Sequence, residues 1–205
     1  MIKKHTGKRV LDVGCAQGNL TQFFLDKEFV MGADYSKEYV KQFEKRFAGK
    51  KNVKVMQLDA TDAKKTNELK RWKFDTAITM NTLEHIKDDV KAMKNVHGIL
   101  ESSGRFIVFV PAGMWLYSIL DYEGGHFRRY TKRELAEKLK KAGFSIDNIK
   151  YVNVAGALGW WTNFVLFKKR IYSPATFNVY NALVPLFRAG ESVVTPPFGL
   201  SVMAV

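Results

Sequence analysis

The chain has 205 residues, of which 46% are hydrophobic and 13% aromatic, enough apolar material for one continuous core. No tract is dominated by Ser, Gly, Pro or Gln, and no repeat is visible, so the composition excludes disordered tails and solenoids. We therefore predict a single domain over residues 1–205. The formal net charge of +13 predicts an anionic partner: nucleic acid, an acidic membrane surface or a phosphorylated substrate. Charge alone does not choose among them.

The amino terminus and the cysteine count indicate the compartment. The first five residues lack the apolar run of a secretory signal, and a lone cysteine, Cys15, cannot form an intramolecular disulfide. We expect a cytoplasmic protein. Because few residues precede the first predicted strand, we also expect an open ligand site, covered by a lid from residues 111–130.

Apolar runs of strand length alternate with segments of helical period, which is typical of a parallel sheet with crossover helices. The predicted strands are Arg9–Val13, Phe29–Asp34, Val53–Leu58, Phe74–Met80, Arg105–Val110, Ile146–Val152 and Leu200–Val205. Helices are predicted after Ser36, with Tyr39, Val40, Phe43 and Phe47 on the core face, and after Asp88, with Val90, Met93, Val96 and Leu100 inward. A third begins at Thr131, with Glu134 completing a capping box, and ends at Gly143.

The most informative stretch runs from Val10 to Leu20, where a strand leads into a glycine-bearing turn and then into a predicted helix. Glycines at such a turn let the backbone approach a nucleotide-like ligand. The dinucleotide fingerprint Gly-x-Gly-x-x-Gly fits poorly, because Gly14 and Gly18 are four residues apart with Ala16 between them. An NAD-dependent oxidoreductase is therefore disfavoured.

This stretch resembles the first motif of class I S-adenosylmethionine (SAM) dependent methyltransferases, an acidic residue followed by Gly-x-Gly-x-Gly, with Ala16 replacing the middle glycine. The resemblance implies that Asp12 holds the ammonium end of SAM and that Gly14 packs against its methionine part. Cys15 and Gly18 belong to the same turn.

Later strand ends extend the resemblance over about residues 8–150. Asp34, with Tyr35 beside it, follows the second strand, where a carboxylate can accept hydrogen bonds from vicinal ribose hydroxyls. Asp59-Ala60 follows the third strand, at the family's adenine position, and Asn81 and Leu83 lie in the fourth motif.

The family has a Rossmann-like α/β fold: a seven-stranded, mostly parallel sheet with helices on both faces and an antiparallel last strand. We assign residues 8–110 to cofactor binding and 111–205 to the acceptor and lid, with a helical insertion over about 155–198. Transfer from a sulfonium is an in-line displacement that leaves S-adenosylhomocysteine (SAH), so we expect neither a metal nor a covalent nucleophile to be needed.

Candidate acceptor-side residues follow the fourth and fifth strands. His126 is the candidate general base, with His85 a second candidate whose role is equally consistent with the cofactor side or with structure. Arg128 and Arg129, with Tyr130 beside them, are candidates for clamping an acidic group on the acceptor. Alternatively, His126 only shapes the loop, and either arginine pairs with Asp121 or Glu123.

The segment Val154–Phe167 is mostly apolar and is followed by Lys168-Lys169-Arg170. Fourteen residues are too few to span a bilayer, so we expect a surface contact with a membrane, an apolar acceptor pocket, or burial against the domain or a second copy. The tail, which ends in Pro197-Phe198-Gly199-Leu200-Ser201, resembles those of methyltransferases associated with cell-envelope glycan or lipid pathways, and this resemblance favours a small or lipid-linked acceptor. The alternatives are an RNA methyltransferase, although no RNA-binding module is visible and nucleic acid is disfavoured, and a non-catalytic SAM-binding regulator.

Overall fold

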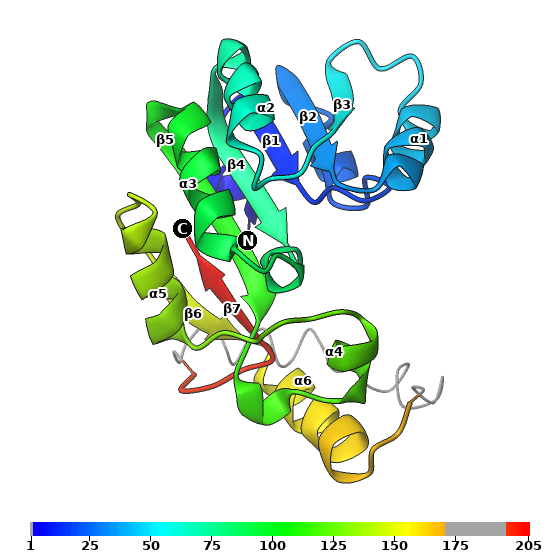
Figure 1. Cartoon of the computed structure of the whole chain (residues 1–205), viewed down its shortest axis with the longest axis vertical. Helices are drawn as coiled ribbons and strands as arrows, with labels where there is room; N and C mark the ends of the chain where they lie inside the picture. The colour runs from blue at the N-terminus through cyan, green and yellow to red at the C-terminus, as the bar shows by residue number, and fades with distance from the viewer. Residues whose placement is uncertain (1, 171–195) are drawn as a thin grey trace.

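The computed structural model describes residues 2–170 and 196–205 and contains a seven-stranded sheet (Figure 1). The strands lie in the order β3-β2-β1-β4-β5-β7-β6. All neighbouring pairs are parallel except those of β7, which runs antiparallel to β5 and to β6. The strand bounds are β1 Arg9–Val13, β2 Phe29–Asp34, β3 Val53–Gln57, β4 Phe74–Met80, β5 Leu100–Pro111, β6 Ile149–Val152 and β7 Ser201–Ala204. This is the predicted Rossmann-like sheet.

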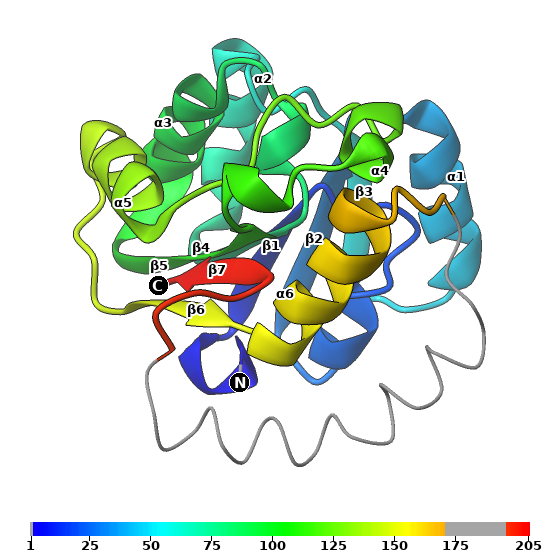
Figure 2. The ribbon, with the colours of Figure 1, turned by 90° about the horizontal axis from the view of Figure 1, so that it is seen from below.

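Helices lie on both faces of the sheet, as predicted (Figure 2). The α-helices are α1 Lys37–Arg46, α2 Ala63–Asn67, α3 Asp89–Ile99, α4 Ile119–Glu123, α5 Lys132–Lys141 and α6 Val154–Trp160. One face is covered by α2, α3 and α5, and the other by α1 and two short 3-10 turns, Ile2–His5 and Thr21–Phe24. Because both faces are covered, the central strands are buried almost throughout.

Successive side chains of a strand point to opposite faces of the sheet and pack into two separate hydrophobic clusters, one on each face. In β1, Leu11 and Val13 belong to the larger cluster beneath α3 and α5, whereas Val10 points to the opposite face. A third, smaller cluster joins Cys15 to Phe43 and Phe47 beside α1. The turn after β1 is thereby packed against α1.

The predicted helix starts agree with the observed caps. Ser36 accepts a hydrogen bond from the Tyr39 N–H at the start of α1. At the start of α5, Thr131 and Glu134 form the predicted capping box, with Thr131 N to Glu134 Oε2 at 2.8 Å and Glu134 N to Thr131 Oγ1 at 3.1 Å. Local side-chain chemistry thus sets these boundaries.

The helix predicted after the glycine turn is wrong. Residues 21–24 form a single 3-10 turn, not an α-helix. Only ten residues separate Gly18 from Phe29, the first residue of β2, and Phe24 must turn inward to fill the core on that face. The glycine turn therefore leads into a short 3-10 turn and not into an α-helix.

The insertion before β7 is described only in part. Helix α6 continues as a π-helical turn, Trp161–Leu166. Of the insertion predicted over about 155–198, the part from 171 to 195 lies outside the described residues. In Figures 1 and 2, α6 lies beside α4, and the Trp160 indole N–H donates to the Leu116 carbonyl at 2.9 Å. Across residues 2–170 and 196–205, none of the helices has both the length and the apolar character needed to cross a bilayer.

Candidate active site

A pocket of about 700 Å³ opens at the carboxyl ends of β1, β2, β3 and β4. Open α/β sheets bind their ligands at this edge, where the strand order reverses. The lining includes most of the predicted cofactor residues, namely Gly14, Ala16, Asp34, Tyr35, Asp59, Ala60 and Asn81. The sheet therefore brings together side chains and backbone from four separate strand ends.

The turn after β1 brings backbone close to its neighbours. Gly14 has φ +75°, and a Cβ there would collide with the Thr82 side chain. Ala16, at the position of the family's middle glycine, also lies in the left-handed region at φ +45°. An alanine is strained there, which explains physically why glycine suits this position. The Ala16 N–H donates to Asp34 Oδ2 at 2.8 Å and fixes the turn against β2.

Asp12 lies below the pocket rather than in its lining. Its side chain is fully buried and accepts a hydrogen bond from the Thr21 hydroxyl at 2.6 Å. Burial raises the pKa of Asp12 to about 6, the nearby Asp34 adds to the rise, and the Thr21 hydrogen bond opposes it. In this structure Asp12 supports the turn, and Gly14 and Ala16 form the surface that a ligand meets.

Asp34 and Asp59 each use part of their hydrogen-bonding capacity within the protein. Asp34 Oδ1 accepts from the Ser36 N–H at 2.8 Å, and Asp59 Oδ1 accepts from the N–H and hydroxyl of Thr61. A carboxylate has about four acceptor positions, so both keep capacity toward the pocket. These contacts hold the two acids in defined orientations.

Three other predicted cofactor residues, Cys15, Gly18 and Leu83, do not line the pocket. Cys15 and Leu83 are buried behind the turn and the β4 end, and burial, with Asp12 and Asp34 nearby, raises the pKa of the Cys15 thiol. Gly18 packs against the rings of Phe47 and Phe43 rather than against the pocket. These three support the site from behind.

Tyr39 corrects the prediction for the first helix. We placed it on the core face, but it is 43% exposed and lines the pocket. It occupies the first turn of α1, beside the carboxyl end of β2, where a helical residue projects back toward the strand end. Helical periodicity placed Tyr39 on the apolar face of α1, but it could not show that the amino end of this face extends beyond the core.

A second group of polar side chains lies at the edge of the pocket. His85, which lines the pocket, meets His126 edge-on, with ring centroids 4.5 Å apart. Glu84 is buried beside them, and neither of its carboxylate oxygens has a hydrogen-bond partner in the described chain. Burial raises the pKa of Glu84 to about 7, against the opposing effects of its own backbone N–H, His126 and Arg129. Burial and the neighbouring His126 lower the pKa of His85.

The predicted acceptor residues Arg129, Arg128 and Tyr130 belong to buried or half-buried networks. Arg129 makes a two-pronged ion pair with Asp121, with Nε to Oδ1 at 2.7 Å and Nη2 to Oδ2 at 3.0 Å. Arg128 pairs with Asp89 at 2.8 Å, and the Tyr130 hydroxyl donates to the same carboxylate at 2.8 Å. The pairing of an arginine with Asp121, an alternative noted from sequence, is the arrangement observed. In this structure these three residues tie the loop to Asp121 and Asp89.

Asp121 connects this network to the histidines. Its carboxylate also accepts from the Ser118 N–H and hydroxyl, and it bonds His126 Nδ1 at 2.8 Å. Although burial opposes ionisation, the hydrogen bonds from His126 and Arg129, with the charge of Arg129, bring the pKa of Asp121 down to about 2. His126 is thus held by an ionised carboxylate that is itself fixed.

With this geometry established, comparison with known proteins decides the family. A family model described as a methyltransferase domain matches residues 4–169. The chain belongs to this methyltransferase family. A curated relative, juvenile hormone acid O-methyltransferase of Bombyx mori, is 31% identical over 107 residues, covering 49% of this chain and 37% of the relative. The chain spans less than two fifths of the curated relatives it matches.

Solved structures show the same fold. A SAM-dependent methyltransferase from Mesorhizobium loti is 14% identical with a TM-score of 0.63, covering 98% of this chain and 90% of that one. The methyltransferase CalH, solved with SAH, is 20% identical with a TM-score of 0.57, covering 72% and 48% of the two chains. Both likenesses show that this chain has the fold of these proteins.

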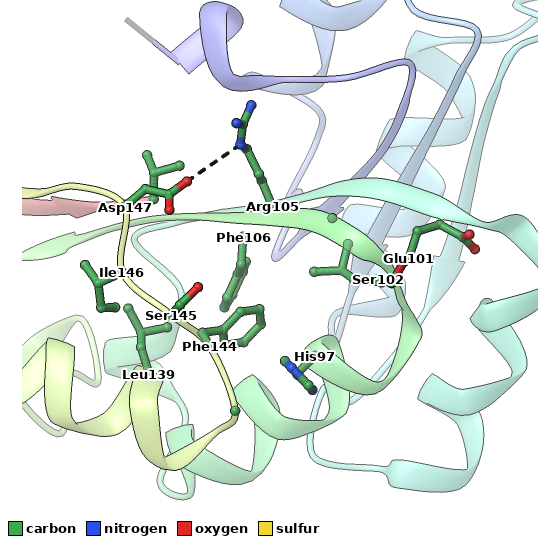
Figure 3. A pocket seen from close by; sticks show the side chains of 14 residues that line it. His97, Glu101, Ser102, Arg105, Phe106, Leu139, Phe144, Ser145, Ile146 and Asp147 are labelled. Carbon is green, nitrogen blue, oxygen red and sulfur yellow. Dashed lines mark ion pairs between the residues drawn. The ribbon is translucent and has the colours of Figure 1, made fainter.

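The methyltransferase has a second, smaller hollow of about 280 Å³ at the opposite edge of the sheet (Figure 3). It is lined by His97 from the end of α3, Phe106 from β5 and Phe144 after α5. An exposed ion pair, Arg105 Nε to Asp147 Oδ2 at 3.9 Å, crosses its rim. Because it lies at the amino end of β5, far from the glycine turn, it is not part of the cofactor site.

Sequence reasoning overlooked Glu84 as a functional residue. Glu84 lies between Leu83 and His85 in the fourth motif, and an isolated glutamate after a strand is ordinarily solvated. The available signal was its position directly after Leu83, a buried apolar residue. The Phe127 N–H donates to the Glu84 carbonyl at 2.8 Å and closes that loop over it.

Proposed function

We propose that this methyltransferase binds SAM in the 700 Å³ pocket and methylates a small-molecule or lipid-linked acceptor at the His85 side of that pocket. The observation that carries the proposal is the convergence of the glycine turn, Asp34 and Asp59 on one opening that ends at His85. SAM supplies an activated methyl group on a sulfonium.

The residues present suit SAM. Gly14 and Ala16 offer a surface with little side chain, against which the methionine part would lie. Asp34 would accept hydrogen bonds from the ribose hydroxyls, and Asp59 from the adenine amino group. Tyr35 and Tyr39, both exposed at the rim, offer aromatic faces beside the position of the adenine. Asp12 would act through the turn that it supports.

Large exposed hydrophobic side chains favour an apolar acceptor. Those of the loop after β5 and of the segment after β6 are Met114, Trp115, Tyr122, Phe127, Leu158, Trp161, Leu166 and Phe167. The basic triplet Lys168-Lys169-Arg170 follows directly. Apolar side chains beside cations suit an amphipathic acceptor with an anionic head, or peripheral contact with an anionic membrane that presents one.

The acceptor's proton would be removed at the group of Glu84, His85 and His126. His126 is oriented by Asp121, and His85 connects it to the pocket. A hydroxyl or carboxyl acceptor placed at His85 would thus meet nitrogen bases while its oxygen faces the methyl donor.

The proposal is tested by SAH release with a panel of acceptors. Apolar carboxylic acids, phenols and polyprenyl phosphates in detergent micelles are compared with transcribed RNA and with no acceptor. We expect SAH release with an amphipathic acceptor and none above background with RNA. Turnover with RNA alone would favour the nucleic-acid alternative, and SAM binding without turnover on any acceptor would favour a regulatory binder.

A further inference from the structure

We propose that Glu84, His85 and His126 form a binding site for a divalent transition-metal ion at the acceptor end of the pocket. Each of the three residues offers one ligand atom, and these atoms lie within 4.8 Å of one another. The role of the metal in methyl transfer rests on the proposed function, but metal binding by these three residues does not. It replaces the metal-free chemistry expected from the sequence.

The buried glutamate is the first argument. Glu84 has no exposed surface, and both its oxygens lack a hydrogen-bond partner in the described part of the chain. An unpaired buried carboxylate is costly, and native proteins retain one where another group compensates it. The neighbouring cation, Arg129, directs its hydrogen bonds to Asp121 and to the Ala112 carbonyl, and none reaches Glu84. A metal ion bound by Glu84 would supply the missing partner.

The second argument comes from the atoms behind the histidines. His126 Nδ1 is held by the Asp121 carboxylate at 2.8 Å, which leaves Nε2 free as the donor atom. The backbone of Gly124 and Gly125 lies beside the His85 ring. Metal-binding histidines characteristically have such a carboxylate or carbonyl behind the ring, which fixes the tautomer.

The spacing and the donor types indicate which ion would bind. Bonds of about 2.1 Å in tetrahedral geometry place donors about 3.4 Å apart, so the widest separation would have to shorten by about 1.4 Å at most. Rotation of the exposed His85 side chain can supply much of this movement. Two imidazoles and one carboxylate suit Zn²⁺ and similar first-row ions, whereas Mg²⁺ prefers oxygen ligands.

The open side of the site faces the cofactor pocket, because His85 lines that pocket while Glu84 is buried behind it. Three protein ligands leave at least one coordination position for a ligand from solution. We assign that position to an oxygen of the acceptor, whose pKa a divalent cation would lower so that its proton passes to solvent water. The oxygen would then form its bond to the methyl carbon of SAM as the carbon–sulfur bond breaks and SAH leaves. His126 then serves as a metal ligand rather than as the free base predicted from sequence.

Equilibrium dialysis of the full chain against Zn²⁺ and Co²⁺, after treatment with a chelator, tests the site without SAM or acceptor. The wild type should bind one ion per chain, and bound Co²⁺ should show the intensified visible absorption of a low-coordinate site. Glu84→Gln and His126→Asn should each weaken binding at least ~10-fold. His97→Asn, a change at an exposed histidine outside the cluster, is the matched control and should bind as the wild type does.

Thermal unfolding in chelator separates metal binding from a structural role. Glu84→Gln replaces a buried carboxyl group, which has no hydrogen-bond partner in the described residues, with a neutral amide of similar size. It should therefore be at least as stable as the wild type without metal, and only the wild type should gain stability from Zn²⁺. A marked loss of stability in chelator would contradict the proposal. So would wild-type protein that binds neither ion, or variants that bind as tightly as the wild type.

The two proposals fail in different ways. If Zn²⁺ binds but no acceptor is methylated, the proposed function is wrong and the metal site stands. If metal-depleted protein methylates its acceptor at the full rate, the role of the metal in the reaction is wrong and the function stands.

Discussion

Replacing Asp121 with Asn tests the buried network that holds the loop after β5. Asp121 is 1% exposed and accepts from Arg129, Ser118 and His126. The pKa of about 2, against an ordinary value of 3.8, corresponds to roughly 2 kcal/mol of native-state stabilisation. The variant also leaves Arg129 buried beside a neutral partner, and removing one member of a buried pair costs about 3–5 kcal/mol. We therefore expect a loss of about 2–5 kcal/mol.

The assay is urea unfolding at pH 7, supported by thermal unfolding, in which the loss corresponds to about 4–20 °C at about 2–4 °C per kcal/mol. Because the pKa of Asp121 is lower in the folded state, its contribution to stability is complete above about pH 4 and is lost as the pH falls toward 2. The control is Arg133→Met, which breaks the exposed Arg133–Glu137 pair and should change little. If Asp121→Asn unfolds no earlier than this control, the network does not stabilise the loop.

Three further predictions concern the cofactor turn and the half-buried network. Ala16→Gly should raise stability by up to about 1 kcal/mol in urea unfolding, because φ +45° strains alanine; a clear destabilisation would contradict this. Tyr130→Phe removes one donor to Asp89 and should cost about 1–2 kcal/mol without changing turnover, whereas lost turnover at intact stability would restore its acceptor role. Because burial raises the folded pKa of Asp12 to about 6, its ionisation lowers stability as pH rises from about 4 to 6. In urea unfolding, the free energy of unfolding of the ligand-free wild type should fall by roughly 3 kcal/mol relative to that of Asp12→Asn over this pH range. A difference between the two proteins that does not change with pH would refute the raised pKa of Asp12.

The sheet was predictable because its strands are buried on both faces. Continuous apolar runs of this kind are a strong signal, and β1, β2 and β4 have the predicted bounds. The ends of other strands were not predictable, because they depend on tertiary contacts. Strand β6 begins at Ile149 rather than Ile146, since Asp147 and Asn148 donate to the Val205 carbonyl before pairing with β7 begins.

In the candidate site, too, some residues could be placed from the sequence and others could not. Motif spacing predicted that Gly14, Asp34 and Asp59 lie together, and all three line one pocket, because topology brings the carboxyl ends of parallel strands together. The loop after β5 gave no such signal. Arg128 and Arg129 were taken for acceptor ligands, but their partners, Asp89 and Asp121, were settled only by how the loop packs on α3 and α4. Sequence marks charged residues without showing which of them are already paired.

The central claim is that the opening at the ends of β1–β4 is the SAM site, and calorimetric titration with SAH tests it most directly. The wild type should bind one SAH per chain. Gly14→Ala, whose Cβ would collide with Thr82, should lose binding at least ~10-fold, while Gly98→Ala, where a Cβ meets open space, should bind as the wild type does. Absence of SAH binding by the folded wild type, or equal affinity in Gly14→Ala, would contradict the account.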